Sequence, residues 1–220
     1  MVIKGDLRFF PDEIKELLQG LALENFFTDG ILCGSWVMLV YRFYHKLVYT
    51  LRTEDIDFAV EAVRHCAADI PGILMKLGYL PVLNIHGLEK YVKGPFSIEF
   101  LVHRKGGKDI PYVTVKEMKI RALPLPFMSM LFIDPLTVDF GEFSIRIPSV
   151  EALFLHKLIV AQRRKHASKA EKDLEQCASL IPAVNAEKLA AIAESQRFSK
   201  DTRTAILKSA SQIGYPPFLK

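Results

Sequence analysis

Two aspartates separated by one residue are the side chains in this sequence best suited to chemistry. Asp55 and Asp57 lie in the run Asp55-Ile56-Asp57-Phe58-Ala59-Val60, where acidic and apolar residues alternate before the run turns apolar. Side chains two positions apart on a β-strand project from one face, so both carboxylates can reach one divalent cation. Magnesium prefers such hard oxygen ligands and keeps positions for water or phosphate oxygens. The spacing therefore predicts a magnesium site on a strand, with a third carboxylate nearby.

Glu99 is the best candidate for that third carboxylate. It interrupts the run Ser97-Ile98-Glu99-Phe100-Leu101-Val102, whose residue types favour a strand. Burying an unpaired charge in such a strand costs free energy, and a bound cation would offset that cost. For each acid taken alone, a solvated strand end or an ion pair is the competing interpretation.

A Gly-Ser pair ends the short apolar run 30–33 and precedes an apolar stretch that starts at Trp36. This pattern predicts a strand, a tight turn at Gly34-Ser35 and a buried helix. A small residue and a hydroxyl at a helix start let backbone N–H groups and the positive end of the helix dipole approach a phosphate. The bulky Trp36 side chain could narrow a channel for that phosphate, although its helical spacing with the following aromatic residues favours a place in the core.

The ordered set of Gly34-Ser35, Thr53 to Phe58 and Ile98 to Phe100 resembles the nucleotidyltransferase superfamily. That superfamily includes DNA polymerase beta, kanamycin nucleotidyltransferase and the nucleotidyltransferase toxins of toxin–antitoxin systems. The resemblance implies that Gly34, Ser35 and Thr53 contact a nucleoside triphosphate. It also implies that Asp55, Asp57 and Glu99 are the catalytic acids and metal ligands, with two Mg²⁺ ions, and that Glu99 helps to activate an acceptor hydroxyl.

The resemblance continues beyond these motifs, from Ile147 to Leu158, which is similar to the helix that follows the catalytic domain in bacterial transferases of this kind. Arg164 and then Lys172-Asp173-Leu174 match the order of basic and acidic residues that follows that helix. Lys157 is thereby implied as a nucleotide-binding residue that neutralises triphosphate charge. A lysine that buries its stem and keeps its charged end in water is the competing interpretation.

The elements needed to position these residues define the expected fold. Strands and helices are interspersed as far as Pro148, and only helices follow, which predicts an α+β protein. We expect a nucleotidyltransferase-like mixed β-sheet flanked by helices over residues 1–148 and a C-terminal helical domain over 149–220. Helices are expected at 11–26, 36–41, 61–78 (divided at Pro71), 149–164, 168–180, 186–194 and 201–213. Strands are expected at 30–33, 55–60, 80–84, 90–92, 96–103, 128–133, 136–140 and 143–147, with a loop at 106–109.

Composition narrows the class of protein. The chain has 220 residues, 50% of them hydrophobic, and a formal charge of +4. Charged residues interrupt every apolar run before it reaches the length of a membrane span, and the first residues lack the pattern of a signal peptide, so we expect a cytoplasmic protein. Cys33, Cys66 and Cys177 lack the spacing of a zinc site or a disulfide framework, and we expect them to be reduced.

These observations favour a magnesium-dependent nucleotidyltransferase that moves a nucleoside monophosphate from a triphosphate to an acceptor hydroxyl and releases pyrophosphate. The acceptor stays open among a small molecule, a protein and an RNA end, as does the oligomeric state. One alternative is a non-catalytic nucleotide-binding or regulatory module of the same fold. Another is a nucleic-acid-binding protein that uses the basic residues Arg163, Arg164, Lys165 and Lys169.

Overall fold

The structure is a computed structural model that describes residues 1–61, 67–104, 106 and 110–219. Cys66, most of the loop expected at 106–109 and part of the helix expected over 61–78 lie outside these residues. Cys33 and Cys177 are buried free thiols, as expected from their spacing. None of the helices in the described part of the chain is long and apolar enough to cross a membrane.

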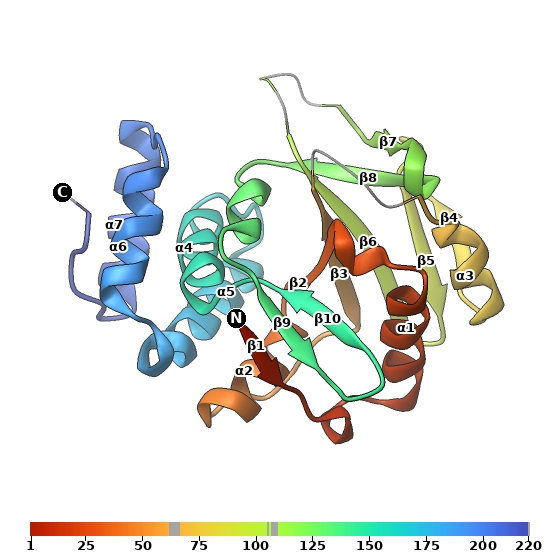
Figure 1. The fold of residues 1–220 in the computed structure, drawn as a ribbon. Coiled ribbons are helices and arrows are strands. Elements are labelled where there is room, and N and C mark those ends of the chain that lie inside the picture. Colours follow the sequence, from red (N-terminus) through yellow and green to blue (C-terminus); the bar gives the residue numbers. More distant parts are fainter. Residues whose placement is uncertain (62–66, 105, 107–109, 220) are drawn as a thin grey trace.

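The main sheet places the two acid-bearing strands side by side (Figure 1). Its strands run in the order β2 (Gly30–Cys33), β3 (Asp55–Val60), β6 (Phe96–His103), β5 (Glu89–Lys93) and β4 (Leu80–Leu83). Strand β3 is antiparallel to β2 and parallel to β6. The other edge of β6 is shared, because β5 pairs with its first residues and β8 (Ile120–Leu125) with its last. Strand β7 (Val113–Val115) pairs only with β8.

Alternation along β3 and β6 separates the acids from the core. Ile56 and Phe58 are fully buried on the face opposite the two aspartates, as the alternation predicts. On this face the Phe58 ring packs 5.4 Å from Phe26 and 5.9 Å from Phe100, measured between ring centroids. Helix α1 (Asp12–Leu23) contributes a fully buried row of apolar residues to the same core and contacts α3 (Ile70–Lys76). The polar face of the sheet is thereby left for the site.

A second, small sheet and helix α2 (Val37–His45) join the main sheet to the helices that follow. Strand β9 (Leu136–Asp139) lies between β1 (Val2–Lys4), to which it is parallel, and β10 (Ser144–Ile147), to which it is antiparallel. The hydroxyl of Tyr41 on α2 donates a hydrogen bond of 2.6 Å to the carbonyl of Pro148. This buried bond ties α2 to the start of the next helix.

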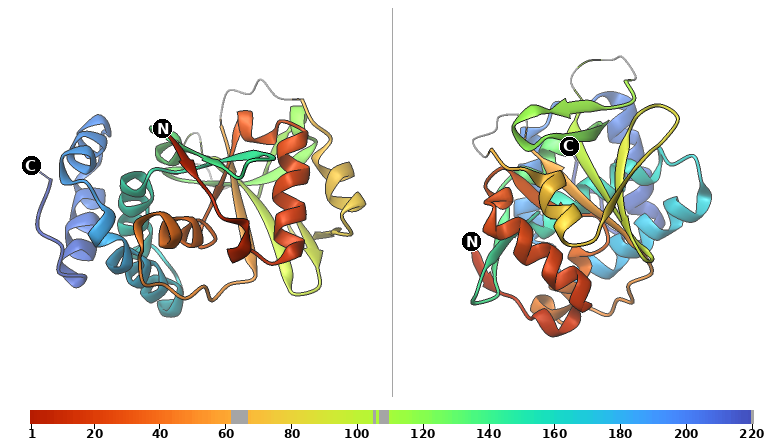
Figure 2. Two further views of the ribbon diagram at one scale, coloured as in Figure 1. Left: turned by 60° about the horizontal axis from the view of Figure 1, so that its bottom comes forward. Right: turned by 90° about the vertical axis from the view of Figure 1, so that its right-hand side faces the viewer.

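The last part of the chain consists of helices, which the views in Figure 2 place to one side of the sheets. They are α4 (Val150–Ala161), α5 (Ala167–Leu180), α6 (Ala186–Ser195) and α7 (Lys200–Gln212), all within two residues of the expected starts. Ser149 caps α4 by accepting a hydrogen bond from the Ala152 N–H. Most residues of helix α4 are buried because α5, α6, α7 and the 3₁₀ helix η4 (Met128–Phe132) all contact it. The division into domains at residue 148 stays a prediction.

Several expected elements differ from the structure. The strand expected at 128–133 is wrong, since these residues form η4, which follows a turn at Phe127 with a φ of 64°. A short apolar run between turns does not distinguish a strand from a buried helical segment by its pattern. Strands β1, β7 and β8 were not expected, and β8 contains Pro124, which pairs in register with Val102 of β6. The remaining 3₁₀ helices are η1 (Leu7–Phe9), η2 (Phe26–Thr28), η3 (Lys116–Met118) and η5 (Ile181–Ala183).

Candidate active site

Strand register brings the three candidate acids together on one face of the sheet. Asp57 of β3 is in register with Glu99 of the parallel strand β6, and Asp55 precedes Asp57 on the same face of β3. Neighbouring strands are separated by about 4.8 Å, so these carboxylates are close neighbours. The Asp55 end of the strand is exposed, whereas Asp57 is half-buried. The acids form one wall of a common site.

Crowding of like charges alters the ionisation of Asp57. Burial, followed by the negative charges of Glu99 and Asp55, raises the pKa of Asp57 from 3.8 to about 6. The positive charges of Lys157 and Arg164 act in the opposite direction and reach the same carboxyl group. The Asp57 carboxyl group is therefore harder to ionise than an exposed aspartate, chiefly because it is buried and also because Glu99 and Asp55 lie nearby.

Glu99 also has a cationic partner that was not predicted. Lys90 on β5 lies opposite Glu99 on the antiparallel strand β6, and its Nζ forms an ion pair with Glu99 Oε1. No three described His, Cys, Asp or Glu side chains are already gathered as a metal site. The donor set nevertheless suits magnesium, because all three side chains offer hard oxygen atoms and the raised pKa of Asp57 reflects a charge that a cation would offset.

The Gly34-Ser35 turn faces the same acids and requires its glycine. Gly34 has a φ of 69°, a left-handed conformation that glycine adopts without strain. A Cβ atom added there would collide with the carboxylate of Asp57. Helix α2 begins directly after the turn, and the Ser35 carbonyl accepts the hydrogen bond of Met38 N–H at 3.1 Å. The N-terminus of α2 therefore lies next to Ser35 at the cleft, and its first N–H groups, which have no partner within the helix, can bind a phosphate there.

We expect Gly34→Ala to weaken triphosphate binding at least about tenfold and to destabilise the fold by about 1–2 kcal/mol. The added methyl group both strains the backbone and displaces Asp57. Calorimetric titration and thermal unfolding measure the two effects. Gly94→Ala is the matched control, because Gly94 has a φ of 56° and no atom within 4 Å of an added Cβ. Equal triphosphate affinities for the two variants would contradict a role for the close approach of Gly34 to Asp57.

Trp36 does not narrow the cleft. Its side chain is only 2% exposed, and its indole Nε1 donates a hydrogen bond of 3.0 Å to the carbonyl of Asp55. The ring stacks on Phe10 with 6.3 Å between centroids. Trp36 therefore belongs to the core, as its helical spacing favours. Its hydrogen bond holds the backbone of Asp55, the first residue of the acid-bearing strand β3.

Cations from α4 and the segment after it form the wall opposite the acids. Lys157 is 5% exposed, and its Nζ lies 2.9 Å from Oδ1 of the buried Asp173 on α5. Arg164 Nε lies 2.7 Å from the other oxygen of Asp173. Burial alone would raise the pKa of Asp173, but the charges of Lys157 and Arg164 outweigh it and hold that pKa below its usual value. One carboxylate thus fixes two cations beside the cleft.

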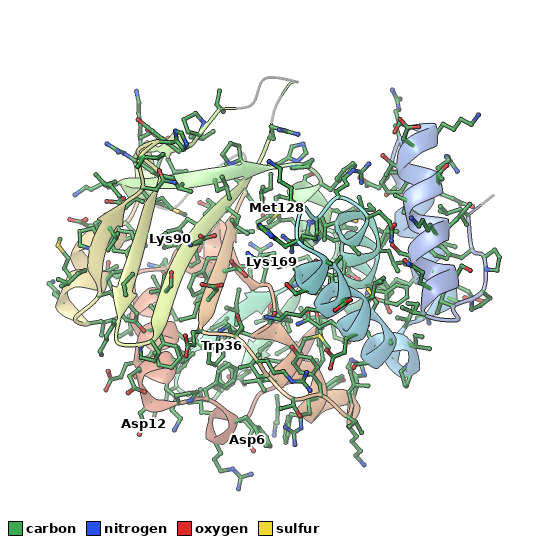
Figure 3. The ribbon with its side chains drawn as sticks, turned by 180° about the vertical axis from the view of Figure 1, so that it is seen from behind. Asp6, Asp12, Trp36, Lys90, Met128 and Lys169 are labelled. Atoms are coloured by element: carbon green, nitrogen blue, oxygen red, sulfur yellow. The ribbon has the colours of Figure 1, made fainter. Side chains whose placement is uncertain are left out.

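The two walls enclose a cleft of about 530 Å³. It is lined by every predicted site residue: Gly34, Ser35, Thr53, Asp55, Asp57, Glu99 and Lys157. Figure 3 labels Lys90, Met128 and Lys169, which border it from the sheet, η4 and the N-terminal end of α5. Burial and the charge of Lys157 lower the pKa of His156 to about 3, so this lining residue is uncharged at neutral pH. The lining also includes the cationic side chains of Arg163, Arg164 and Lys172, and an aliphatic part formed by Leu101, Leu123, Leu125, Leu131, Leu153 and Val160.

Lys90 and Gln176 are the side chains that sequence reasoning missed. Lys90 reaches Glu99 only through strand pairing, for which the sequence offers no local signal. Gln176 hydrogen-bonds to Ser35 and follows Lys172-Asp173 by one helical turn. That spacing puts all three on one side of a helix and could have identified Gln176. The family resemblance included Asp173 by its order in the sequence but gave it no role.

The mixed sheet with carboxylates on neighbouring parallel strands, the Gly-Ser turn at a helix start and the cations Lys157 and Arg164 form the arrangement that the resemblance to nucleotidyltransferases implied. The structure is similar to that of an antigenic nucleotidyltransferase-like protein from Paracoccidioides brasiliensis, with a TM-score of 0.51 and 15% identity over 91% of this chain and 88% of that chain. This likeness confirms the expected fold.

The antibiotic-resistance factor ANT(2'')-Ia is a second similar structure, with a TM-score of 0.47 and 14% identity over 91% of this chain and 95% of that one. No curated protein sequence matches the chain. Residues 12–198 match the model of a protein family described as nucleotidyltransferase. The chain belongs to this family, and the protein is a nucleotidyltransferase.

Proposed function

We propose that the protein transfers a nucleoside monophosphate from a nucleoside triphosphate to an acceptor hydroxyl in a magnesium-dependent reaction. The observation that supports this most strongly is the division of charge across one cleft. Asp55, Asp57 and Glu99 face Lys157 and Arg164. Such a cleft suits a reaction in which cations hold phosphate oxygens while a carboxylate receives the proton of a hydroxyl group.

The triphosphate would lie between the turn and the cationic wall. Backbone N–H groups at the start of α2 and the Ser35 hydroxyl would donate hydrogen bonds to its oxygens. Lys157 would offset charge that grows on the leaving pyrophosphate, and Thr53 lines the same cleft. Because Asp173 holds Lys157 in position before a ligand arrives, little side-chain entropy is lost when the triphosphate binds.

In the transfer step, the acceptor oxygen forms a bond to the α-phosphorus while the bond from that phosphorus to the bridging oxygen of the β-phosphate breaks. Pyrophosphate leaves, and the acceptor proton passes to a carboxylate. We assign the proton to Glu99, because Lys90 positions it beside Asp57. Bound magnesium, with Asp55, Asp57 and Glu99 as its ligands, would stabilise the negative charge on the attacking acceptor oxygen and on the leaving pyrophosphate. Two ions follow from the family resemblance.

The positions of the basic residues favour this proposal over a nucleic-acid-binding protein. Arg163 donates a hydrogen bond of 2.9 Å to Thr202 and stacks over the Phe127 ring at 4.9 Å. Arg164 is bound to Asp173. Both arginines line the cleft and therefore do not form a separate surface for a phosphate backbone. A regulatory module that binds the triphosphate but transfers nothing would have the same binding site. Only an assay of nucleotidyl transfer distinguishes it from an enzyme.

Binding of the four ribonucleoside triphosphates by calorimetry, with and without magnesium, tests the proposal. We expect at least one triphosphate to bind in a magnesium-dependent manner, and the double substitution Asp55→Asn/Asp57→Asn to abolish that binding because it removes the proposed ligands. A folded wild-type protein that binds no triphosphate would refute the proposed function.

A triphosphate labelled at its α-phosphate, offered with hydroxyl-bearing small molecules, RNA or protein, then identifies the acceptor as the class of molecule to which the label becomes attached. Pyrophosphate release measures the rate. A protein that binds the triphosphate and labels no acceptor would instead be the regulatory module.

A further inference from the structure

Gln176 on α5 contacts the Gly-Ser turn from outside the catalytic sheet. Its side chain is fully buried, and its Nε2 donates hydrogen bonds to Ser35 Oγ at 2.9 Å and to the Tyr49 hydroxyl at 2.6 Å. Its Oε1 has no hydrogen-bond partner within the described part of the chain. Burying an amide with an unsatisfied oxygen costs free energy, so stability alone gives a poor account of this residue.

The direction of the hydrogen bond determines what Ser35 can do. A serine hydroxyl has one proton to donate and two lone pairs that accept. Because the Gln176 amide donates to Ser35 Oγ, the contact occupies a lone pair and leaves the proton of Ser35 available. Ser35 lines the cleft, so this proton can be directed to a phosphate oxygen there. The two N–H bonds of the Gln176 amide point to two acceptors, the hydroxyl oxygens of Ser35 and Tyr49, and together they fix the orientation of the amide plane.

We propose that Gln176 is a positioning residue that keeps the Ser35 hydroxyl a hydrogen-bond donor toward the triphosphate, an inference that rests on the proposed function. Helix α5 carries Lys172 and Asp173 one turn before Gln176. Asp173 holds Lys157, and Gln176 holds Ser35. One helix outside the acid-bearing sheet therefore sets both the cation and the hydroxyl that face the triphosphate.

Two substitutions at Gln176 separate positioning from packing. Gln176→Glu keeps the shape of the side chain, but an ionised carboxylate has only acceptors. The Ser35 hydroxyl must then donate its hydrogen bond to this carboxylate and can no longer donate to the phosphate. We expect Gln176→Glu to weaken magnesium-dependent triphosphate binding at least about tenfold, as expected for an unfavourable buried charge and a lost hydrogen bond. Gln176→Met, of similar volume, leaves the hydroxyl free to rotate and is expected to weaken binding about three- to fivefold.

A double-mutant cycle with Ser35→Ala provides the decisive measurement. If Gln176 acts through the Ser35 hydroxyl, Gln176→Met has no further effect on triphosphate affinity once Ser35 is alanine. Gln162→Met is the matched control, because the Gln162 amide at the end of α4 also donates two hydrogen bonds, to Ser209 at 3.0 Å and to Gln212 at 2.7 Å on α7, but does not contact the turn. We expect this control to bind triphosphate with wild-type affinity.

Calorimetry of each variant, with thermal unfolding to verify that it folds, decides the outcome. Affinities of folded Gln176→Met and Gln176→Glu within twofold of wild type would overturn the inference, as would additive effects of Ser35→Ala and Gln176→Met. A wild-type protein that binds no triphosphate refutes the proposed function itself and is recognised in the same experiment.

Discussion

Replacing Asp57 by Asn is expected to lower the rate of nucleotidyl transfer about a thousandfold while making the protein more stable. The activity is lost because the amide cannot replace a carboxylate as a ligand of magnesium or as a charge opposite Lys157. The stability is gained because ionised Asp57, in the absence of a cation, is first of all buried away from water and also lies beside the negative charges of Glu99 and Asp55.

The pH dependence of the stability gain follows from the raised pKa of Asp57. The folded-state pKa of about 6 exceeds the ordinary value of 3.8, so the native protein holds this proton more tightly than the unfolded chain does. Ionised Asp57 therefore opposes folding above about pH 6, and the penalty disappears as the pH falls through 6 toward 4. With allowance for the part of the side chain that contacts water, we expect Asp57→Asn to add about 1–2 kcal/mol to the free energy of unfolding at pH 7.5.

Thermal unfolding at pH 7.5 and pH 4.5 in magnesium-free buffer, together with pyrophosphate release, measures both effects. Asp69→Asn is the control, because the pKa of Asp69 is lowered in the folded protein whereas that of Asp57 is raised. Asp69 caps α3 and pairs with Lys119 at 3.0 Å, and hydrogen bonds from Lys119 and the Gly72 N–H lower its pKa. Its replacement is expected to lower stability at neutral pH and to leave the transfer rate unchanged. Loss of stability in Asp57→Asn at pH 7.5 would contradict the charge crowding inferred for the acids.

Residues close in sequence account for the part of the site that could be predicted. Asp55 and Asp57 share a face because a strand repeats every two residues, and Gly34-Ser35 lies between a strand and a helix whose apolar patterns are clear. The helices after residue 148 were predicted because capping residues such as Ser149 mark their starts. The site residues lie together in one cleft, although their roles are still predictions.

Contacts between distant segments account for most of what could not be predicted. Lys90 meets Glu99 only because β5 pairs antiparallel with β6, and Gln176 meets Ser35 across most of the chain length. Strand β8 was not predicted, because Pro124 and Pro126 indicated only that this stretch is not an ordinary helix. A proline lacks an N–H group to donate, yet Pro124 lies in register with Val102 where β8 pairs with the last residues of β6. Tertiary context overrides local preference at such places.

Replacing Lys157 by Met is expected to weaken triphosphate binding about a hundredfold and to destabilise the protein by about 2–3 kcal/mol. The substitution removes the most deeply buried cation of the cleft and leaves Asp173 with Arg164 as its remaining partner. Because the charge of Lys157 lowers the pKa of Asp57, that pKa is expected to rise further in the variant. Triphosphate binding that requires ionised Asp57 should then begin to fail at a higher pH than in wild type.

Two further variants separate the role of Lys157 in binding from its role in stability. Lys188→Met removes a partly buried lysine that pairs with Asp134 and Glu151 outside the cleft, and is expected to lower stability without altering triphosphate affinity. Lys157→Met/Asp173→Leu also removes the carboxylate that Lys157→Met leaves underpaired, and replacing a buried ion pair by apolar groups often restores stability. We expect the double variant to regain thermal stability and to remain deficient in binding. Recovery of triphosphate affinity along with stability would show that Lys157 acts on the fold and not on the phosphates.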